Sequence, residues 1–189
     1  AIGAEGAAFL GDGLAASPSL ETLNLDGCAL GATGAVALAN GVGQSHTLRC
    51  LLLKHNHLGA KGVASLSNMI AQSHTLTELD LSFNEIKAEG ASALASAVRV
   101  SAELETLKVA SNELGYGGVI LLARCFYGDQ AYGNQVHGYE ALQQPNVAED
   151  GSECRVKECD VRWNEVPEAD KAMIQQEAAL ARPSFSWVL

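Results

Sequence analysis

Two consecutive segments decide the fold: residues 48–75 read LRCLLLKHNHLGAKGVASLSNMIAQSHT, and residues 76–103 read LTELDLSFNEIKAEGASALASAVRVSAE. Both begin with the pattern L-x-x-L-x-L-x-x-N-x-(L/I) and have the same length of 28 residues. Leucine and asparagine therefore recur at fixed places, which indicates internal repeats. Such a spacing is typical of one structural unit that is stacked on copies of itself.

The pattern extends in both directions from these two segments. One copy precedes them in the same register, and another follows them from Leu104. A degenerate fifth copy begins 52 residues after Leu104, so that 24 extra residues interrupt the array. The residues that define the five copies are Leu20, Leu23, Leu25, Cys28 and Leu30; Leu48, Leu51, Leu53, Asn56 and Leu58; Leu76, Leu79, Leu81, Asn84 and Ile86; Leu104, Leu107, Val109, Asn112 and Leu114; and Val156, Cys159, Val161, Asn164 and Val166.

These copies divide the chain into four parts. Residues 1–19 are a partial first repeat, and residues 20–126 are four regular repeats. Residues 127–155 are an insertion loop, and residues 156–189 hold the degenerate fifth repeat with a C-terminal capping helix and tail. The apolar end of the tail either folds back as a cap or enters a neighbouring protein.

Each copy combines two periodicities. The second and third leucines of L-x-x-L-x-L point inward along a short strand, and the residues between them point outward. The Asn or Cys that follows turns inward and bonds the backbone of the loops. A helix then buries one apolar stripe, formed in the first regular copy by Val36, Leu38, Ala39 and Val42. The sequence thus predicts an α/β solenoid of about five and a half repeats, with parallel strands inside an arc and helices outside.

The motif L-x-x-L-x-L-x-x-N-x-L-G-x-x-G-x-x-x-L resembles the leucine-rich repeats of ribonuclease inhibitor, Ran GTPase-activating proteins and NOD-like receptors. The resemblance covers residues 1–126 well and residues 156–182 loosely. It implies a leucine-rich-repeat solenoid of the 28-residue subfamily. Because those relatives share only an interaction surface, it implies protein binding without naming a partner.

Outward side chains on successive strands form columns across the predicted arc. Exposed apolar and aromatic groups ringed by charged residues are typical of a protein interface. The alternative is that Phe83 and Trp163 fold over the strand ends as local core. The predicted partner-binding residues of the strands are Leu52, Lys54, His55, Asp80, Phe83, Lys108, Asp160, Arg162 and Trp163.

The insertion at residues 127–155 is a second candidate for binding. Long excursions without periodicity are usually functional or disordered. Its tyrosines, above all Tyr132 and Tyr139, offer contact area with a polar tip. We expect a loop that docks on a partner or across the arc, with a mobile surface loop as the alternative.

Composition narrows the class of partner. The net charge is −10, which argues against nucleic-acid binding. The acidic C-terminal third favours a basic partner, although solubility alone is enough to explain it. Five cysteines without framework spacing indicate reduced thiols and a reducing compartment, whether cytoplasmic, ciliary or organellar. No apolar run is long enough for membrane insertion.

No catalytic, cofactor or metal signature stands out. His46 and His74 occupy equivalent turns one copy apart, but two ligands in a solvated loop make a poor metal site. Cys154 and Cys159 lack a second cysteine pair. No nucleophile motif or phosphate-binding loop is present.

We therefore expect a non-enzymatic scaffold that works as a subunit of a larger assembly and binds protein through its concave strands and the 127–155 loop. Two alternatives remain. One is a regulator of a small GTPase, which the resemblance raises and for which Arg49 and Arg162 lie on the concave side. The other is a fragment of an innate-immunity-like receptor.

Overall fold

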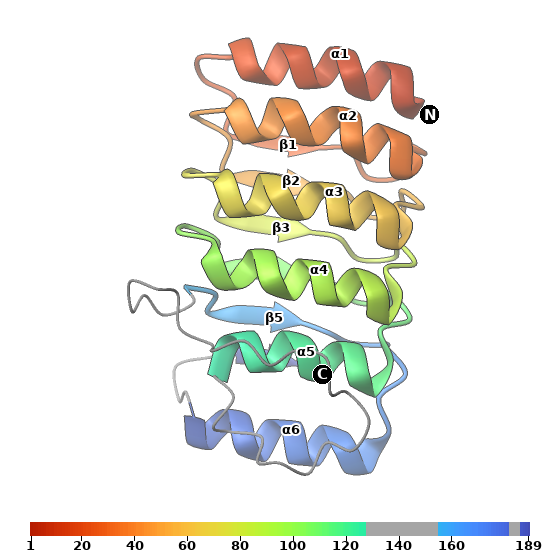
Figure 1. The fold of residues 1–189 in the computed structure, drawn as a ribbon, viewed down its shortest axis with the longest axis vertical. Helices are drawn as coiled ribbons and strands as arrows, with labels where there is room; N and C mark the ends of the chain where they lie inside the picture. The colour runs from red at the N-terminus through yellow and green to blue at the C-terminus, as the bar shows by residue number, and fades with distance from the viewer. Residues whose placement is uncertain (128–154, 182–185) are drawn as a thin grey trace.

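The computed structural model describes residues 1–127, 155–181 and 186–189 of the chain. Helices and short strands alternate along it (Figure 1). The helices are α1 (Gly3–Ala16), α2 (Gly31–Gln44), α3 (Gly59–Gln72), α4 (Lys87–Val100), α5 (Gly115–Tyr127) and α6 (Glu168–Ala181). The strands are β1 (Thr22–Asn24), β2 (Cys50–Leu52), β3 (Glu78–Asp80), β4 (Thr106–Lys108), β5 (Glu158–Asp160) and β6 (Ser186–Val188).

All six strands lie in one parallel sheet whose spatial order is the chain order, β1 to β6. The central leucines of the first four copies are paired side by side, Leu23 with Leu51, Leu51 with Leu79, and Leu79 with Leu107. Leu107 pairs in turn with Cys159 of the degenerate copy, despite the 24 extra residues between them. The predicted α/β solenoid of leucine-rich repeats is confirmed.

The C-terminal tail forms one more strand than the sequence predicts. Residues 186–188 pair with β5, and Trp187 stands opposite Cys159 in the register. The tail therefore folds back onto its own sheet. The motif did not reveal this strand because it lacks the leucines that mark the others.

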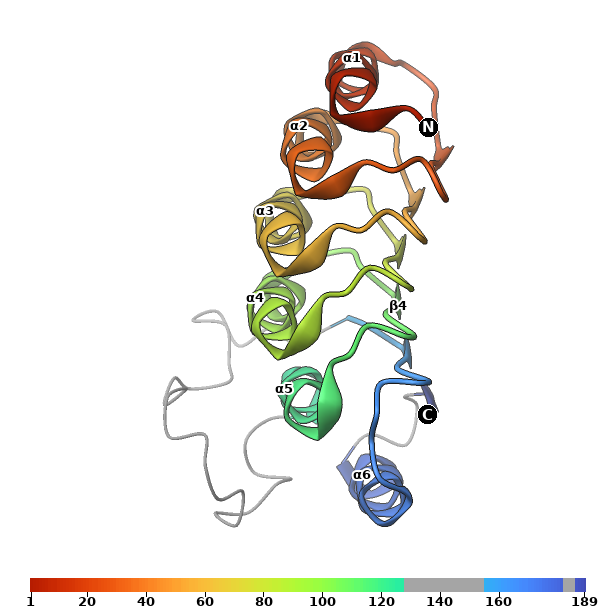
Figure 2. The ribbon, with the colours of Figure 1, turned by 90° about the vertical axis from the view of Figure 1, so that its right-hand side faces the viewer.

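The elements stack into an arc with the sheet on its inner side and the helices on its outer side (Figure 2). Strands pack about 4.8 Å apart, whereas helices pack about 8–10 Å apart. A layer of helices stacked on a layer of strands must therefore bend toward the strands. This curvature leaves the outward side chains of β1–β5 on the concave surface.

One continuous core lies between the two layers. The inward leucines of β2–β4 and the inner stripes of the helices are almost fully buried, for example Leu51, Leu66 and Leu94 at 0% exposure. The stripe predicted for α2 is wrong at Val36, which is 49% exposed, although Leu38, Ala39 and Val42 are buried. Val36 faces away from the sheet on the outer surface of α2, where the array is open to solvent.

A ladder of buried asparagines ties consecutive copies together. Asn84, at 0% exposure, donates from Nδ2 to Leu53 O of the preceding copy and to Leu81 O of its own copy, and its Oδ1 accepts the N–H of Asn56. Asn56, Asn112 and Asn164 each donate backward in the same way. Cys28, in the same slot, is only half-buried and its thiol donates weakly to Asp26 O.

Candidate functional site

Three residues after the end of each of the strands β1–β5, the chain turns away from the sheet at an equivalent residue. These residues, Gly27, His55, Phe83, Ser111 and Trp163, are called here the exit column; all have left-handed backbone, with φ between 52° and 65°. The chain must bend sharply there to leave the strand. The bends are held in line by hydrogen bonds between copies: the N–H of His55 donates to Ser82 O, that of Phe83 to Ala110 O, and that of Ser111 to Arg162 O.

The exit column exposes its aromatic rings. Phe83 is 37% exposed and Trp163 is 66% exposed, so neither is core, and the alternative in which both fold over the strand ends is wrong. The rings of His55 and Phe83 stack with their centroids 4.2 Å apart and their planes 23° apart. Lys54 Nζ lies 5.8 Å from the Phe83 centroid, and Arg162 Cζ lies 4.8 Å from that of Trp163. The structure therefore joins Lys54 and His55 to Phe83, and Arg162 to Trp163.

Two predicted rim residues, Asp80 and Asp160, are nearly buried, at 6% and 7% exposure. Each caps the end of its strand: Asp80 Oδ1 accepts the N–H of Ser82, and Asp160 Oδ1 accepts the N–H of Arg162. A carboxylate that bonds the backbone two residues later stabilises a turn. Their expected exposure was therefore wrong, because the pattern shows the side of the strand but not which neighbours cover it.

The Asp160 carboxylate also binds the side chain of Arg162. Arg162 Nε and Nη2 donate to its two oxygens at 3.0 and 2.8 Å. Burial by itself raises the pKa of Asp160, but these hydrogen bonds and the guanidinium charge outweigh it and leave the pKa below its usual value. The pair fixes the guanidinium over β5, beside Trp163.

Lys108 and Leu52 stand at the middle of the strand surface, both half-exposed. Lys108 Nζ donates to Glu78 Oε1 at 2.6 Å, and this hydrogen bond raises the pKa of Lys108 although burial opposes the change. Burial and the adjacent Glu78 raise the pKa of the Cys50 thiol, which keeps it protonated. Sequence reasoning missed Glu78; its place in the preceding copy, two residues before the register partner of Lys108, was the available signal.

These side chains form one continuous surface, called here the strand wall: residues 52–55, 80–83, 108–111 and 160–163. Two of its three cations are paired with acids, Arg162 with Asp160 of the wall and Lys108 with Glu78 beside it. Its exposed groups are rings, a leucine and charged side chains. The backbone beneath is fixed by interstrand hydrogen bonds. Such a surface suits the burial of a protein segment better than proton transfer or covalent catalysis.

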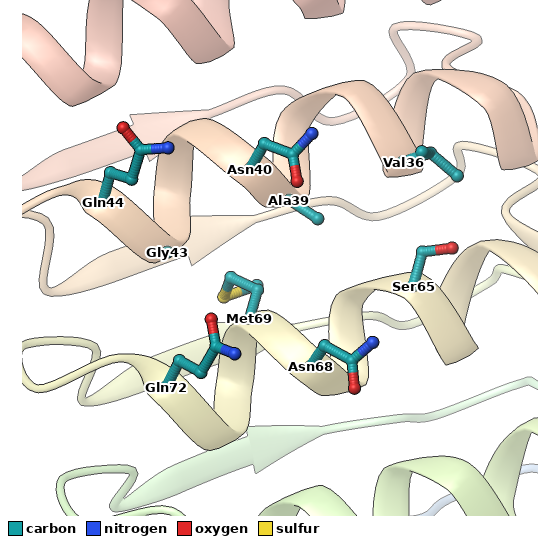
Figure 3. A pocket seen from close by; sticks show the side chains of 9 residues that line it. All are labelled: Val36, Ala39, Asn40, Gly43, Gln44, Ser65, Asn68, Met69 and Gln72. Atoms are coloured by element: carbon teal, nitrogen blue, oxygen red, sulfur yellow. The ribbon is translucent and has the colours of Figure 1, made fainter.

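The helical face carries a hollow of about 320 Å³ between α2 and α3, which the sequence analysis did not predict (Figure 3). The small residues Gly43 and Ala39 leave space above Met69. Four carboxamide side chains, together with Val36 and Ser65, line the rest of the hollow. The carboxamides are Asn40, Gln44, Asn68 and Gln72. Asn and Gln at the same places of two copies were the available signal, and this hollow explains the exposure of Val36.

Several other predicted features are absent from the wall or lie outside the described residues. Tyr132 and Tyr139 belong to residues 128–154, which the structure does not describe. His46 and His74 are both exposed on turns at the ends of α2 and α3. Among the described side chains, no three His, Cys, Asp or Glu residues are grouped so as to hold a metal ion. None of the helices in the described ranges is long and apolar enough to cross a membrane.

Comparison with known proteins agrees with the repeat register. A family model described as Leucine Rich repeat matches residues 16–39, 44–67, 72–95 and 101–123, about half of the chain. None of the curated proteins compared with the chain matches it significantly. Each matched segment contains one strand of the sheet and most of the following helix. The chain therefore belongs to the leucine-rich repeat family.

Proposed function

We propose that this protein is a non-enzymatic scaffold that holds a partner protein on its strand wall, as a subunit of a larger assembly. The observation that carries the proposal is the exposure of Phe83 and Trp163 on a rigid concave surface. Aromatic rings in solvent cost hydration free energy that a partner recovers when it covers them. Trp, Tyr and Arg are also the residues that most often dominate binding energy at interfaces.

The contacts around the rings support binding because they fix the side chains beforehand. Phe83 is held by His55 on one side and approached by Lys54, and Trp163 is approached by a guanidinium that Asp160 anchors. A partner therefore has fewer rotamers to order on the wall, a cost of about 0.5–1.5 kcal/mol for each mobile side chain. This preorganisation favours affinity over adaptability.

The charges of the wall support specificity more than affinity. Lys108 and Arg162 are already paired with Glu78 and Asp160, so covering them does not leave an isolated buried charge. A partner must instead match the polar edges of these pairs. Such matching excludes wrong partners while the rings supply most of the contact energy.

Affinity capture with matched variants tests this function. Immobilised wild-type protein is compared with Phe83→Ala, Trp163→Ala and the control Phe9→Ala, which removes a ring that is 79% exposed on α1. We expect one or more proteins to be retained by the wild type and by Phe9→Ala, and to be depleted about tenfold or more by either wall variant. The thermal unfolding temperatures of all four proteins should be nearly the same.

Equal retention by all four proteins would show that the wall is not the binding surface. A large loss of stability in Phe83→Ala or Trp163→Ala would show that these rings are structural. Mass spectrometry of the retained proteins then identifies which partner depends on the wall.

A further inference from the structure

Three residues of the exit column carry flat rings, and the place between two of these rings holds none. His55, Phe83 and Trp163 carry rings at equivalent positions, whereas Ser111 stands between Phe83 and Trp163 with only a hydroxymethyl group. All four residues share the same left-handed backbone, with φ from 52° to 59°. Their side chains therefore leave the sheet in the same direction, and the space above Ser111 corresponds to a missing ring.

The size of this space follows from the sheet. Consecutive strands are about 4.8 Å apart, so the backbones of Phe83 and Trp163 are separated by about 9.6 Å across Ser111. The neighbouring His55 and Phe83 rings, one copy apart, stack at 4.2 Å. Phe83 and Trp163 are two copies apart, so the distance between them accepts one flat group stacked on both rings and is too short for two such groups.

A second column, two residues further along each turn, indicates the charge of the group that fits. Its members in the third, fourth and fifth copies are Glu85, Glu113 and Glu165. His57 Nδ1 and Glu85 Oε1 are 2.7 Å apart, which shows that side chains of this column reach from one copy to the next. Glu113 and Glu165 are exposed, carry like charges on adjacent copies, and make no hydrogen bond or ion pair within the described chain.

The wall itself displays the stacking chemistry that such a group would use. Arg162 Cζ lies 4.8 Å from the centroid of Trp163, and the two hydrogen bonds to Asp160 hold that guanidinium over the middle of β5. Arg162 is thus committed to its own strand, one residue before the exit column. Guanidinium groups stack on aromatic faces more readily than ammonium groups, because they are planar and more weakly hydrated.

We propose that the space above Ser111 binds the guanidinium of an arginine from the partner, stacked between Phe83 and Trp163 and paired with Glu113 and Glu165. This inference rests on the proposed function and names the chemistry of its partner: a protein segment that presents arginine. A lysine brings the charge without the plane, and a phenylalanine brings the plane without the charge. The net charge of −10 further attracts a basic segment.

Short peptides test the inference without knowledge of the partner. The probe is a Gly/Ser peptide with one central Arg, compared with the same peptide carrying Lys, citrulline, Phe or Glu there. A Trp187→Phe background leaves Trp163 as the single tryptophan reporter. We expect the Arg peptide to change the Trp163 fluorescence saturably and to bind about five to thirty times more tightly than the Lys and citrulline peptides. Equal binding of Arg and Lys, or preference for Phe, would overturn the proposal.

Variants locate the bound group. Ser111→Tyr should fill the space and abolish binding, whereas Ser111→Ala should retain it; tyrosine is compatible with this backbone because equivalent positions carry His, Phe and Trp. Glu113→Gln and Glu165→Gln should each weaken binding about two- to fivefold. Undiminished binding to Ser111→Tyr, read from amide NMR shifts as well as fluorescence, would also overturn the proposal.

The peptide and capture experiments together distinguish a failure of the arginine site from a failure of the proposed function. If the Arg peptide fails but a captured protein still depends on Phe83 and Trp163, the arginine site is wrong and the binding wall stands. If no captured protein depends on those rings, the proposed function fails whatever the peptides do.

Discussion

The backbone N–H of Asn56 donates to Oδ1 of Asn84, 2.9 Å away and 28 residues later in the chain. The same oxygen accepts the N–H of Leu58, and the amide nitrogen of Asn84 binds three carbonyls in two copies. One buried side chain thus satisfies backbone groups on both sides of a repeat boundary. The rigidity of the strand wall depends on this ladder.

Asn84→Ala should lower the free energy of unfolding by at least about 3 kcal/mol, because it leaves several buried backbone groups without partners. Cys28→Ala is the matched control in the same slot of the first copy, where the half-buried thiol makes one weak bond. Its cost should stay below about 1 kcal/mol. Urea titration followed by circular dichroism measures both; similar losses for the two variants would show that the ladder contributes little.

Gly41→Ala should destabilise the protein by about 1–3 kcal/mol, because α1 and α2 approach each other there without room for a side chain. A Cβ on Gly41 would lie 2.0 Å from Gly11 O and 2.4 Å from Gly11 Cα. Gly13→Ala, on the same helix pair, meets nothing within 4 Å and should gain about 0.5–1 kcal/mol from helix propensity. Chemical denaturation measures the free energies of unfolding of both variants and thereby checks the packing of α1 on α2. If Gly41→Ala were as stable as the wild type, this close approach would be contradicted.

The stability that Asp160 contributes should depend on pH. Its pKa in the folded protein lies below the usual 3.8, because the bonds to Arg162 outweigh burial. The carboxylate therefore contributes fully above pH 3.8, and its contribution is lost as the pH falls from there through the lowered pKa. Wild type should be more stable than Asp160→Asn at pH 7, and the difference should shrink in acid below pH 3.8. A difference that is constant from pH 7 to the acid end would contradict this ion pair.

Much of the fold could be predicted because its determinants are local and repeated. The spacing of Leu51, Leu79 and Leu107 fixes the register, and the buried asparagines follow the same period. Val36 was misassigned because a stripe at helical spacing does not show where two helices leave a hollow between them, as α2 and α3 do beside Val36. The strand at residues 186–188 was missed because pairing with β5, rather than its own pattern, makes it a strand.

The candidate site could be predicted only in outline. The alternation of each strand places Phe83 and Trp163 outside the core, and the structure exposes both. Which outward residues neighbours cover depends on contacts between copies, so Asp80 was wrongly expected at an exposed rim. The place above Ser111 could be recognised only from the shared backbone conformation of the exit residues and the stacking of His55 on Phe83, and no single copy contains that information.

Hydroxyl-radical footprinting of the complex with a captured partner tests the strand wall most directly. The oxidation rates of Phe83 and Trp163 should fall at least about fivefold on binding, because the partner covers them. Phe9 lies on α1 and is more exposed than Phe83 or Trp163, so its oxidation rate should not change and serves as the internal reference. Unchanged rates at Phe83 and Trp163, with protection at Phe9 instead, would contradict binding on the wall.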